Sequence, residues 1–192
     1  MSFARRTDIA LAAVGVGVIT LDQLTKHIIS AYFGVPGQKP PIKLLGPVLA
    51  LDYTQNHGVA FSLFDGQGVK YVFILAAVAL VGYLYWRTRS TASALLTITY
   101  GLILGGAIGN LLDRFTLHYV VDFIHFQVPH VFDWPVFNIA DSAISVGVAL
   151  LAVLLWRAPA PLNGAPSTDG DAGVQDTPAA HPRVRRKVAG SR

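Results

Sequence analysis

Residues 94–112 read ALLTITYGLILGGAIGNLL and contain no charged side chain. A helix rises about 1.5 Å per residue, so a stretch of this length nearly spans the roughly 30 Å hydrocarbon core of a bilayer. Three other apolar stretches of comparable length occur, which are Ile9–Leu21 with its continuation to Phe33, Val69–Trp86 and Val136–Trp156. We therefore predict an α-helical polytopic membrane protein with four transmembrane helices.

The composition agrees with this class. Of 192 residues, 53% are apolar and 14% are charged, against about 25% charged residues in soluble chains. The absence of Cys excludes thiol nucleophiles, thiolate metal sites and disulfide scaffolds. All eleven acidic residues are Asp, so carboxylate chemistry in this chain must come from aspartates.

The first apolar segment has a second interpretation. Arg5 and Arg6 followed by an apolar run are typical of a cleavable signal peptide. However, no A-x-A-like cleavage site follows, and the helical pattern continues to Phe33. We favour a retained helix.

Lys and Arg fall mainly on one side of the predicted helices. Ten of the fifteen lie before the first helix, between the second and third, or after the fourth. Because cytoplasmic loops are enriched in basic residues, we expect both termini in the cytoplasm.

Two segments are then external. Residues 33–68 contain PIKLLGPVLALDYTQNHGVAFSLF (41–64), whose alternation suggests short strands. Residues 115–135 are aromatic-rich and are expected at the interface. We expect residues 1–157 to form one transmembrane domain and residues 158–192, rich in Pro, Gly and Ala, a disordered basic tail in the cytoplasm.

Polar side chains within the apolar segments gather at the predicted external ends of the helices. They are Asp22, Lys26, Asn110, Asp113, Arg114, Asn138 and Asp141, and Asp122 follows the third helix. Because charges inside a membrane are expensive and usually face a cavity or a partner, this common depth predicts a functional site.

The spacing leaves alternatives open for several of these residues. Asp22 and Lys26, four residues apart, either neutralise each other as an ion pair or act directly in function. Arg114, four residues after Asn110, either holds an anionic group such as a lipid phosphate or extends to the interface. Asp113 lies on another face of its helix and is expected to make a structural hydrogen bond or ion pair.

The third helix also carries two overlapping GxxxG motifs, formed by Gly101, Gly105 and Gly109. Small residues at this spacing allow helices to approach closely. We expect them to hold the polar end of this helix close to the fourth helix, where Asn138 and Asp141 are three residues apart and face the same way.

Other catalytic chemistries have weaker support. No metal-ligand spacing is found among the external histidines, whose rings we expect to pack at the interface. These are His57, His118, His125 and His130. A serine nucleophile, either Ser62 or Ser142, would need Lys26 as its base, and no GxSxG motif supports it.

Asp122 and Asp141 are the best chemical pair. The chain between them contains two prolines and can double back, so both carboxylates can meet at the external surface. Two carboxylates held close together cannot both ionise easily. The ionised one can take a proton from water, while the protonated one polarises a carbonyl and protonates the leaving amine. Membrane aspartates also serve proton-coupled transporters, and the glycine-rich helix would suit a scaffold protein, so both alternatives remain.

Five blocks occur in one order along residues 8–156. They are LDQLTK (21–26), QNHGVAFS (55–62), GGAIGNLLDRF (105–115), VVDFIHF (120–126) and FNIADSAI (137–144). Together they resemble the signature blocks of the bacterial lipoprotein signal peptidase family, signal peptidase II. The resemblance implies an aspartic membrane peptidase with Asp122 and Asp141 as its catalytic dyad. Such an enzyme removes the signal peptide from prolipoproteins after a diacylglyceryl group has been attached to the Cys just after the cut.

The same resemblance assigns expected roles to the remaining polar residues. Positions that line or support the substrate pocket are matched by Asp22, Lys26, Asn56, Asn110, Arg114 and Asn138. Asp113 matches a position tied to the integrity of the site, and Gly58 is expected to let a substrate backbone approach closely. Residues 33–68 should form a small external β-cradle with a short interfacial helix.

The resemblance also sets expectations for location and partners. The site should face the periplasm from the bacterial inner membrane. We expect a monomer that contacts membrane lipid and its diacylglyceryl prolipoprotein substrates, uses no cofactor or metal, and binds no nucleic acid.

Overall fold

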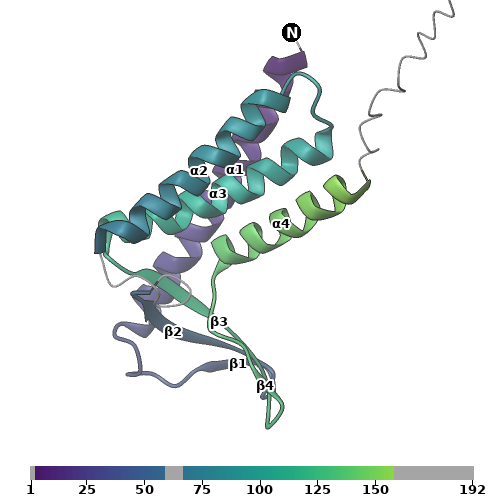
Figure 1. The fold of residues 1–192 in the computed structure, drawn as a ribbon. Coiled ribbons are helices and arrows are strands. Elements are labelled where there is room, and N and C mark those ends of the chain that lie inside the picture. Colours follow the sequence, from purple (N-terminus) through teal and green to yellow (C-terminus); the bar gives the residue numbers. More distant parts are fainter. Residues whose placement is uncertain (1–2, 59–66, 158–192) are drawn as a thin grey trace, which may run out of the picture. The chain divides into compact units, whose positions relative to one another are not determined.

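A computed structural model describes residues 3–58 and 67–157 of the chain. The helices are α1 (Phe3–Phe33), α2 (Gln67–Thr88), α3 (Ala94–Thr116) and α4 (Ile139–Arg157) (Figure 1). The strands are β1 (Ile42–Leu45), β2 (Leu49–Asn56), β3 (Val120–Val128) and β4 (Phe132–Asp133). The tail predicted for residues 158–192 lies outside the described residues.

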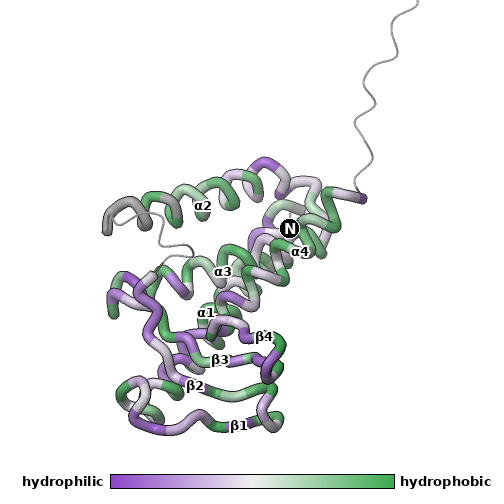
Figure 2. Tube along the Cα trace, turned by 60° about the horizontal axis from the view of Figure 1, so that its bottom comes forward, coloured by the Kyte–Doolittle hydropathy of each residue, from purple (hydrophilic) through white to green (hydrophobic). Residues whose placement is uncertain are grey.

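The helices match the apolar segments of the sequence. Within the described ranges, three stretches are long and apolar enough to cross a membrane, namely Ala4–Phe33, Ala94–Thr116 and Ile139–Arg157. α2 has 22 residues, and its described apolar part, Ile74–Thr88, is shorter than a full crossing. Hydrophobic residues dominate the helices, whereas hydrophilic residues are frequent in the strands and turns (Figure 2).

α3 lies between the other helices and contacts all three of them. Its glycines explain how closely α1 approaches. A Cβ atom on Gly101 would lie 2.8 Å from Cβ of Val14, and one on Gly105 would lie 2.9 Å from the carbonyl oxygen of Gly15. The GxxxG stripe therefore packs α3 mainly against α1. The expectation that it holds α3 against α4 was wrong for these two glycines. A fourth glycine outside the stripe, Gly106, faces α4.

The strands form one antiparallel sheet in the order β1-β2-β3-β4. The strands expected within residues 41–64 are confirmed as β1 and β2. The longest strand, β3, was not predicted, because residues 115–135 were interpreted only as an interfacial segment. No helix lies in residues 34–58, and the part of the expected interfacial helix that would fall in 59–66 is outside the described residues.

A small apolar core joins the sheet to the end of α1. It consists of Ile29 and Phe33 from α1, Tyr53 from β2, and Val121 and Phe123 from β3, all buried. This core holds β3 beside the helices. It thereby positions the side chain of Asp122, which follows Val121 on β3.

The start of α1, the end of α2 and the end of α4, which carry Arg and are called the basic end, lie at the end of the bundle away from the sheet (Figure 1). There the Asp8 carboxylate accepts a hydrogen bond of 2.6 Å from the Tyr85 hydroxyl and lies 3.4 Å from Nη1 of Arg89. Thr7 donates its hydroxyl to the carbonyl oxygen of Arg89 at 3.0 Å. These contacts join the start of α1 to the end of α2.

Candidate active site

A buried polar cluster lies where the helices meet the sheet. Its members come from α1, α3, β3 and the start of α4, as the common depth of the polar residues predicted. The buried members are Asp22, Lys26, Asn110, Asp113, Asp122 and Asn138, and Asp141 is half-buried. Among the described residues, no buried side-chain polar atom lacks a hydrogen-bond partner.

The Lys26 ammonium is the central positive charge of this cluster. Its Nζ atom lies 2.7 Å from Oδ2 of Asp22 and 2.9 Å from Oδ2 of Asp113, and it donates to Oδ1 of Asn110 at 2.9 Å. Of the two alternatives for Asp22 and Lys26, the ion pair is present, and Asp113, for which a hydrogen bond or an ion pair was expected, forms an ion pair with the same ammonium. Because three acceptors surround the ammonium, Lys26 is not placed to act as a base.

Ser142, the candidate serine that the structure describes, does not form a nucleophile site with Lys26. The Ser142 hydroxyl donates to the carbonyl oxygen of Asn138 at 2.9 Å. Ser62 lies outside the described residues.

Gln23 is a member of the cluster that sequence reasoning missed. Its Nε2 atom donates to Oδ1 of Asp113 at 2.8 Å, to the carbonyl oxygen of Gly109 at 3.2 Å and to Oδ2 of Asp22 at 3.3 Å. The residue lies next to Asp22 in LDQLTK, and a polar amide at this position in an apolar helix was the feature of the sequence that indicated it. Gln23 bridges α1 to the polar end of α3.

Asn138 caps the start of α4. Its Oδ1 atom accepts the backbone N–H of Asp141 at 2.8 Å, and its own backbone N–H donates to Oδ2 of Asp141 at 3.3 Å. This reciprocal pair is a capping box, which satisfies two donors that a helix start otherwise leaves unpaired. Asn138 and Asp141 were expected to share a helix face, but Asn138 precedes the helix and turns back toward it.

A further donor at the start of α4 is satisfied from another helix. The backbone N–H of Ala140 donates to Oδ1 of Asp22 at 2.9 Å. Asp22 therefore anchors α4 to α1 as well as neutralising Lys26.

Asp122 is held in place by two amide side chains. It lies on β3 opposite Thr54 of β2. Its Oδ1 atom accepts from Nδ2 of Asn138 at 2.7 Å, and its Oδ2 atom accepts from Nδ2 of Asn56 at 2.9 Å. The Asn56 amide is in turn oriented by the backbone N–H of Gly58, which donates to its Oδ1 atom at 3.0 Å.

Asn138 and Asn110 connect the two aspartates of the predicted dyad. Asn138 donates from its side chain to Asp122 and from its backbone to Asp141. Asn110 donates from Nδ2 to Oδ1 of Asp141 at 2.7 Å, and its Oδ1 atom accepts from Nδ2 of Asn138 at 3.1 Å. The structure thus brings together residues that are 19 positions apart in the sequence.

The environment of Asp122 favours its protonated form. Burial, with the nearby charge of Asp141 adding to it, raises the pKa of Asp122 to about 6. The hydrogen bonds from Asn56 and Asn138 and the charge of Lys26 act in the opposite direction. A carboxyl group that changes protonation close to neutral pH suits acid–base chemistry.

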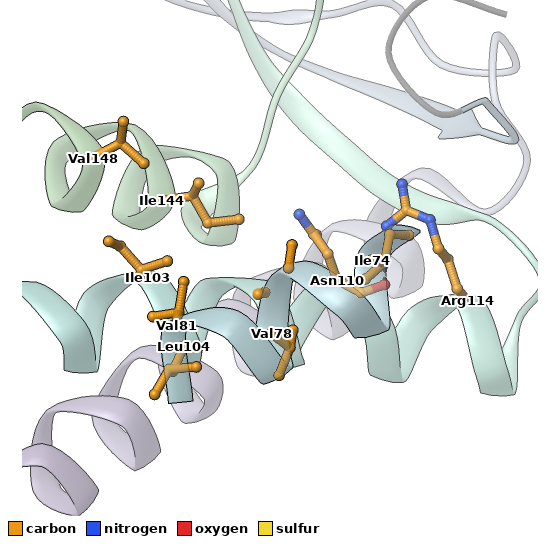
Figure 3. A pocket seen from close by; sticks show the side chains of 11 residues that line it. Ile74, Val78, Val81, Ile103, Leu104, Asn110, Arg114, Ile144 and Val148 are labelled. Carbon is orange, nitrogen blue, oxygen red and sulfur yellow. Dashed lines mark hydrogen bonds between the residues drawn. The ribbon is translucent and has the colours of Figure 1, made fainter. Parts of the chain in front are cut away.

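An apolar pocket of about 380 Å³ opens beside this cluster, between α2, α3 and α4. Asn110 and Arg114 lie at one end of the pocket, and the aliphatic side chains of Ile103, Leu104 and Val148 lie toward the other (Figure 3). Arg114 donates to the carbonyl oxygens of Asn110 at 3.2 Å and Gly58 at 3.4 Å. Its guanidinium is therefore held at the polar end of the pocket.

The histidines show two kinds of contact. The ring of His57 packs on Tyr119 with 5.4 Å between ring centroids, as expected of an interfacial histidine. In contrast, Nε2 of His125 lies 2.7 Å from Oδ1 of Asp133. In residues 3–58 and 67–157, no three His or Asp side chains are grouped as metal ligands.

Comparisons with known proteins give a consistent family. The family model described as signal peptidase (SPase) II matches residues 14–157. The lipoprotein signal peptidase of Halothermothrix orenii is 41% identical over 143 residues, covering 73% of this chain and 90% of its own length. Those of Caldicellulosiruptor bescii and Mesorhizobium japonicum are 42% and 40% identical, covering 71% and 76% of this chain and 84% and 86% of theirs.

Solved structures agree with this comparison. Two structures described as bacterial membrane enzymes, at 1.9 and 2.3 Å resolution, match with TM-scores of 0.65 and 0.63 at 25% and 26% identity. They cover 78% and 76% of this chain, and the matches span 94% and 87% of their own chains. The resemblance seen in the five sequence blocks is thereby confirmed, and the chain belongs to the signal peptidase II family of membrane-embedded bacterial lipoprotein signal peptidases.

Proposed function

We propose that this chain is an aspartic endopeptidase whose catalytic dyad is Asp122 and Asp141. Its substrates are prolipoproteins that carry a diacylglyceryl group, and it cuts the peptide bond just before the lipidated Cys. The main observation behind the proposal is that Asn138 donates hydrogen bonds to both carboxylates within one cluster. The family membership of the chain supports the same substrate class.

The two carboxylates supply the chemistry of hydrolysis. The ionised member takes a proton from a water molecule, and the water oxygen forms a bond to the carbonyl carbon of the scissile peptide. The protonated member donates to the carbonyl oxygen, and the tetrahedral intermediate then expels the amine of the Cys, which leaves with a proton from the dyad.

The other polar residues position the dyad and the substrate. Asn56, Asn110 and Asn138 orient the carboxylates through the hydrogen bonds described above. Lys26 holds Asn110, and Asp22 and Asp113 keep this buried ammonium paired. Arg114 lines the polar end of the pocket and donates to the carbonyl oxygen of Gly58, so a peptide backbone bound there can meet polar groups.

The apolar pocket suits the signal peptide, which is itself a hydrophobic segment of the membrane. We infer four membrane spans, with α2 as the fourth, and both termini in the cytoplasm because the basic helix ends lie away from the sheet. The dyad then lies at the periplasmic face of the bacterial inner membrane. We infer that the enzyme acts as a monomer and binds its substrate from the surrounding lipid.

Conservative replacement of each aspartate tests the dyad. In detergent or nanodiscs, Asp122→Asn and Asp141→Asn should each lower the cleavage rate of a purified diacylglyceryl precursor by about 10²–10⁴-fold. Asp52→Asn, at a half-buried carboxylate on β2 outside the cluster, is the matched control and should keep the wild-type rate. Normal cleavage by either dyad variant would reject the assignment. Proton transport into liposomes by a wild-type protein that cleaves no precursor would favour the transporter alternative.

A further inference from the structure

A second hollow, of about 360 Å³, lies on another side of α4. It is lined by Phe126 and Trp134 from the hairpin of β3 and β4, and by Asp141, Ser142, Ser145 and Val146 from α4. Ser142, Ser145 and Val146 lie on one side of α4, whereas Ile144 and Val148, which line the 380 Å³ pocket, lie on another. With 3.6 residues per turn, Asp141 lies between these two sides of the helix. The start of α4 therefore separates two hollows, with a dyad residue at their boundary.

The hairpin that covers this hollow has one apolar face. Val128 pairs with Phe132, and the backbone N–H of Trp134 donates to the carbonyl oxygen of Phe126 at 3.0 Å. Because side chains alternate along strands, Phe126, Val128, Phe132 and Trp134 share this face. The opposite face is polar, since Gln127 pairs with Asp133 and Asp133 contacts His125.

The apolar face continues into the lipid-facing surface of α4. Trp134 is 51% exposed and Val146 is 53% exposed. Ser142 and Val146 also line a third hollow of about 430 Å³, which follows α1 and α3 away from the sheet. The lining of the hollow under the hairpin therefore includes both exposed apolar side chains, such as Trp134 and Val146, and Asp141.

We propose that the hollow between the β3–β4 hairpin and α4 binds an acyl chain of the substrate's diacylglyceryl group. This proposal rests on the proposed function. A lipidated precursor has two apolar parts, the signal peptide before the scissile bond and the acyl chains on the Cys after it. The two hollows that meet at Asp141 match this arrangement.

The side chains that line the two hollows indicate which part of the substrate binds in each. The pocket between α2, α3 and α4 contains Asn110 and Arg114, whose donors suit the carbonyl groups of a peptide. The hollow under the hairpin is lined by apolar side chains and two serines besides Asp141, which suits a neutral hydrocarbon chain. The acyl chain is thus placed under the hairpin and the signal peptide on the other side of α4.

Filling each hollow in turn tests the assignment. Ser145→Phe places a large side chain under the hairpin, and Ala107→Phe places one in the pocket between α2, α3 and α4. Each variant is assayed with two forms of one precursor peptide, carrying either long or short acyl chains. Ser145→Phe should lower kcat/KM for the long-chain form about tenfold more than for the short-chain form, whereas Ala107→Phe should lower both by the same factor. Ser145→Leu serves as the milder variant if Ser145→Phe does not fold.

Equal loss for both chain lengths in the Ser145 variants would overturn the proposal, as would chain-length dependence confined to Ala107→Phe. An independent readout uses Asp122→Asn, which should hold its substrate uncleaved, with a photoactivatable group at the end of the acyl chain. Adducts competed by unlabelled lipidated peptide are expected on the hairpin and α4, and adducts confined to α2 and α3 would overturn the proposal. If wild-type protein cleaves neither precursor, the proposed function itself fails, which is a separate result.

Discussion

Asp122, a member of the proposed dyad, is a residue whose burial lowers the stability of the fold when its carboxyl group is ionised. Its pKa is raised to about 6, chiefly by burial, so the folded state is penalised whenever this carboxyl is ionised. Between the model-peptide value of 3.8 and about 6, the folded chain binds more protons at this site than the unfolded chain does. The contribution of Asp122 to stability therefore falls as the pH rises through this window.

We predict that Asp122→Asn is inactive but more stable than the wild type at pH 7. One pKa unit corresponds to about 1.4 kcal/mol, so with the pKa raised from 3.8 to about 6, removing the charge should stabilise the fold by about 3 kcal/mol above pH 6. The difference should shrink as the pH falls and vanish below about pH 4, where the wild-type carboxyl is protonated in both states. Apparent melting temperatures of the two proteins between pH 4 and pH 8 check this, and a variant that melts lower at pH 7 would contradict it.

Asp22→Asn is the matched control, because it should act in the opposite direction. An asparagine keeps an acceptor for the backbone N–H of Ala140 but removes a negative charge 2.7 Å from the Lys26 ammonium. Breaking a buried ion pair in this way typically destabilises a protein by about 3–5 kcal/mol. The same melting series should therefore distinguish Asp22, whose carboxylate stabilises the fold, from Asp122, whose carboxylate destabilises it.

At the scale of elements, α3 positions the start of α4 through a glycine. A Cβ atom on Gly106 would collide with the carbonyl oxygen of Ala140 and would lie 2.8 Å from Cγ1 of Ile144. A backbone carbonyl cannot move away without moving its helix, so the first turn of α4 would shift together with Asp141. The contact between α3 and α4 thus helps to determine where Asp141 of the proposed dyad lies.

We predict that Gly106→Ala lowers both the melting temperature and the cleavage rate, the latter by about tenfold or more because small misplacements at a catalytic site are costly. Gly82→Ala on α2 is the control, since nothing beyond the nearby backbone of its own helix lies within 4 Å of its added Cβ. There the better helix propensity of Ala should leave stability equal or raised by up to about 1 kcal/mol. Unchanged cleavage by Gly106→Ala would show that α4 tolerates the shift.

The elements also show where sequence reasoning ends. The helices follow from apolar runs whose length matches the membrane, so their existence was predictable. β3 was not, because its first four residues, Val120–Phe123, are all buried and show no alternation of apolar and polar side chains. A buried run of this kind, which includes the carboxylate of Asp122, becomes recognisable as a strand only when its partner strand and α1 are known.

At the scale of the whole described unit, the sequence located the site but not its internal connections. Polar residues at a common helix depth predicted the cluster, and the family resemblance singled out Asp122 and Asp141. The capping role of Asn138 and the bridging role of Gln23 depend on neighbours from other segments, which no local pattern contains. The separation of a polar, sheet-covered end from a basic end does follow from the sequence, because Lys and Arg mark the cytoplasmic ends of membrane helices.

This separation gives a prediction about orientation that uses the absence of Cys from the chain. Lys43 of β1 and Ser90 in the turn between α2 and α3 are both exposed, at the sheet end and the basic end respectively. In cells with a permeable outer membrane, a maleimide that cannot cross the inner membrane should label Lys43→Cys but not Ser90→Cys. Both should be labelled after the membrane is disrupted, which controls for reactivity. The reverse pattern would place the dyad in the cytoplasm, and labelling of both in intact cells would mean that α2 and α3 do not cross as a pair. Because a lipidated precursor presents its scissile bond at the outer surface, labelling of Lys43→Cys alone is the result that the peptidase mechanism requires.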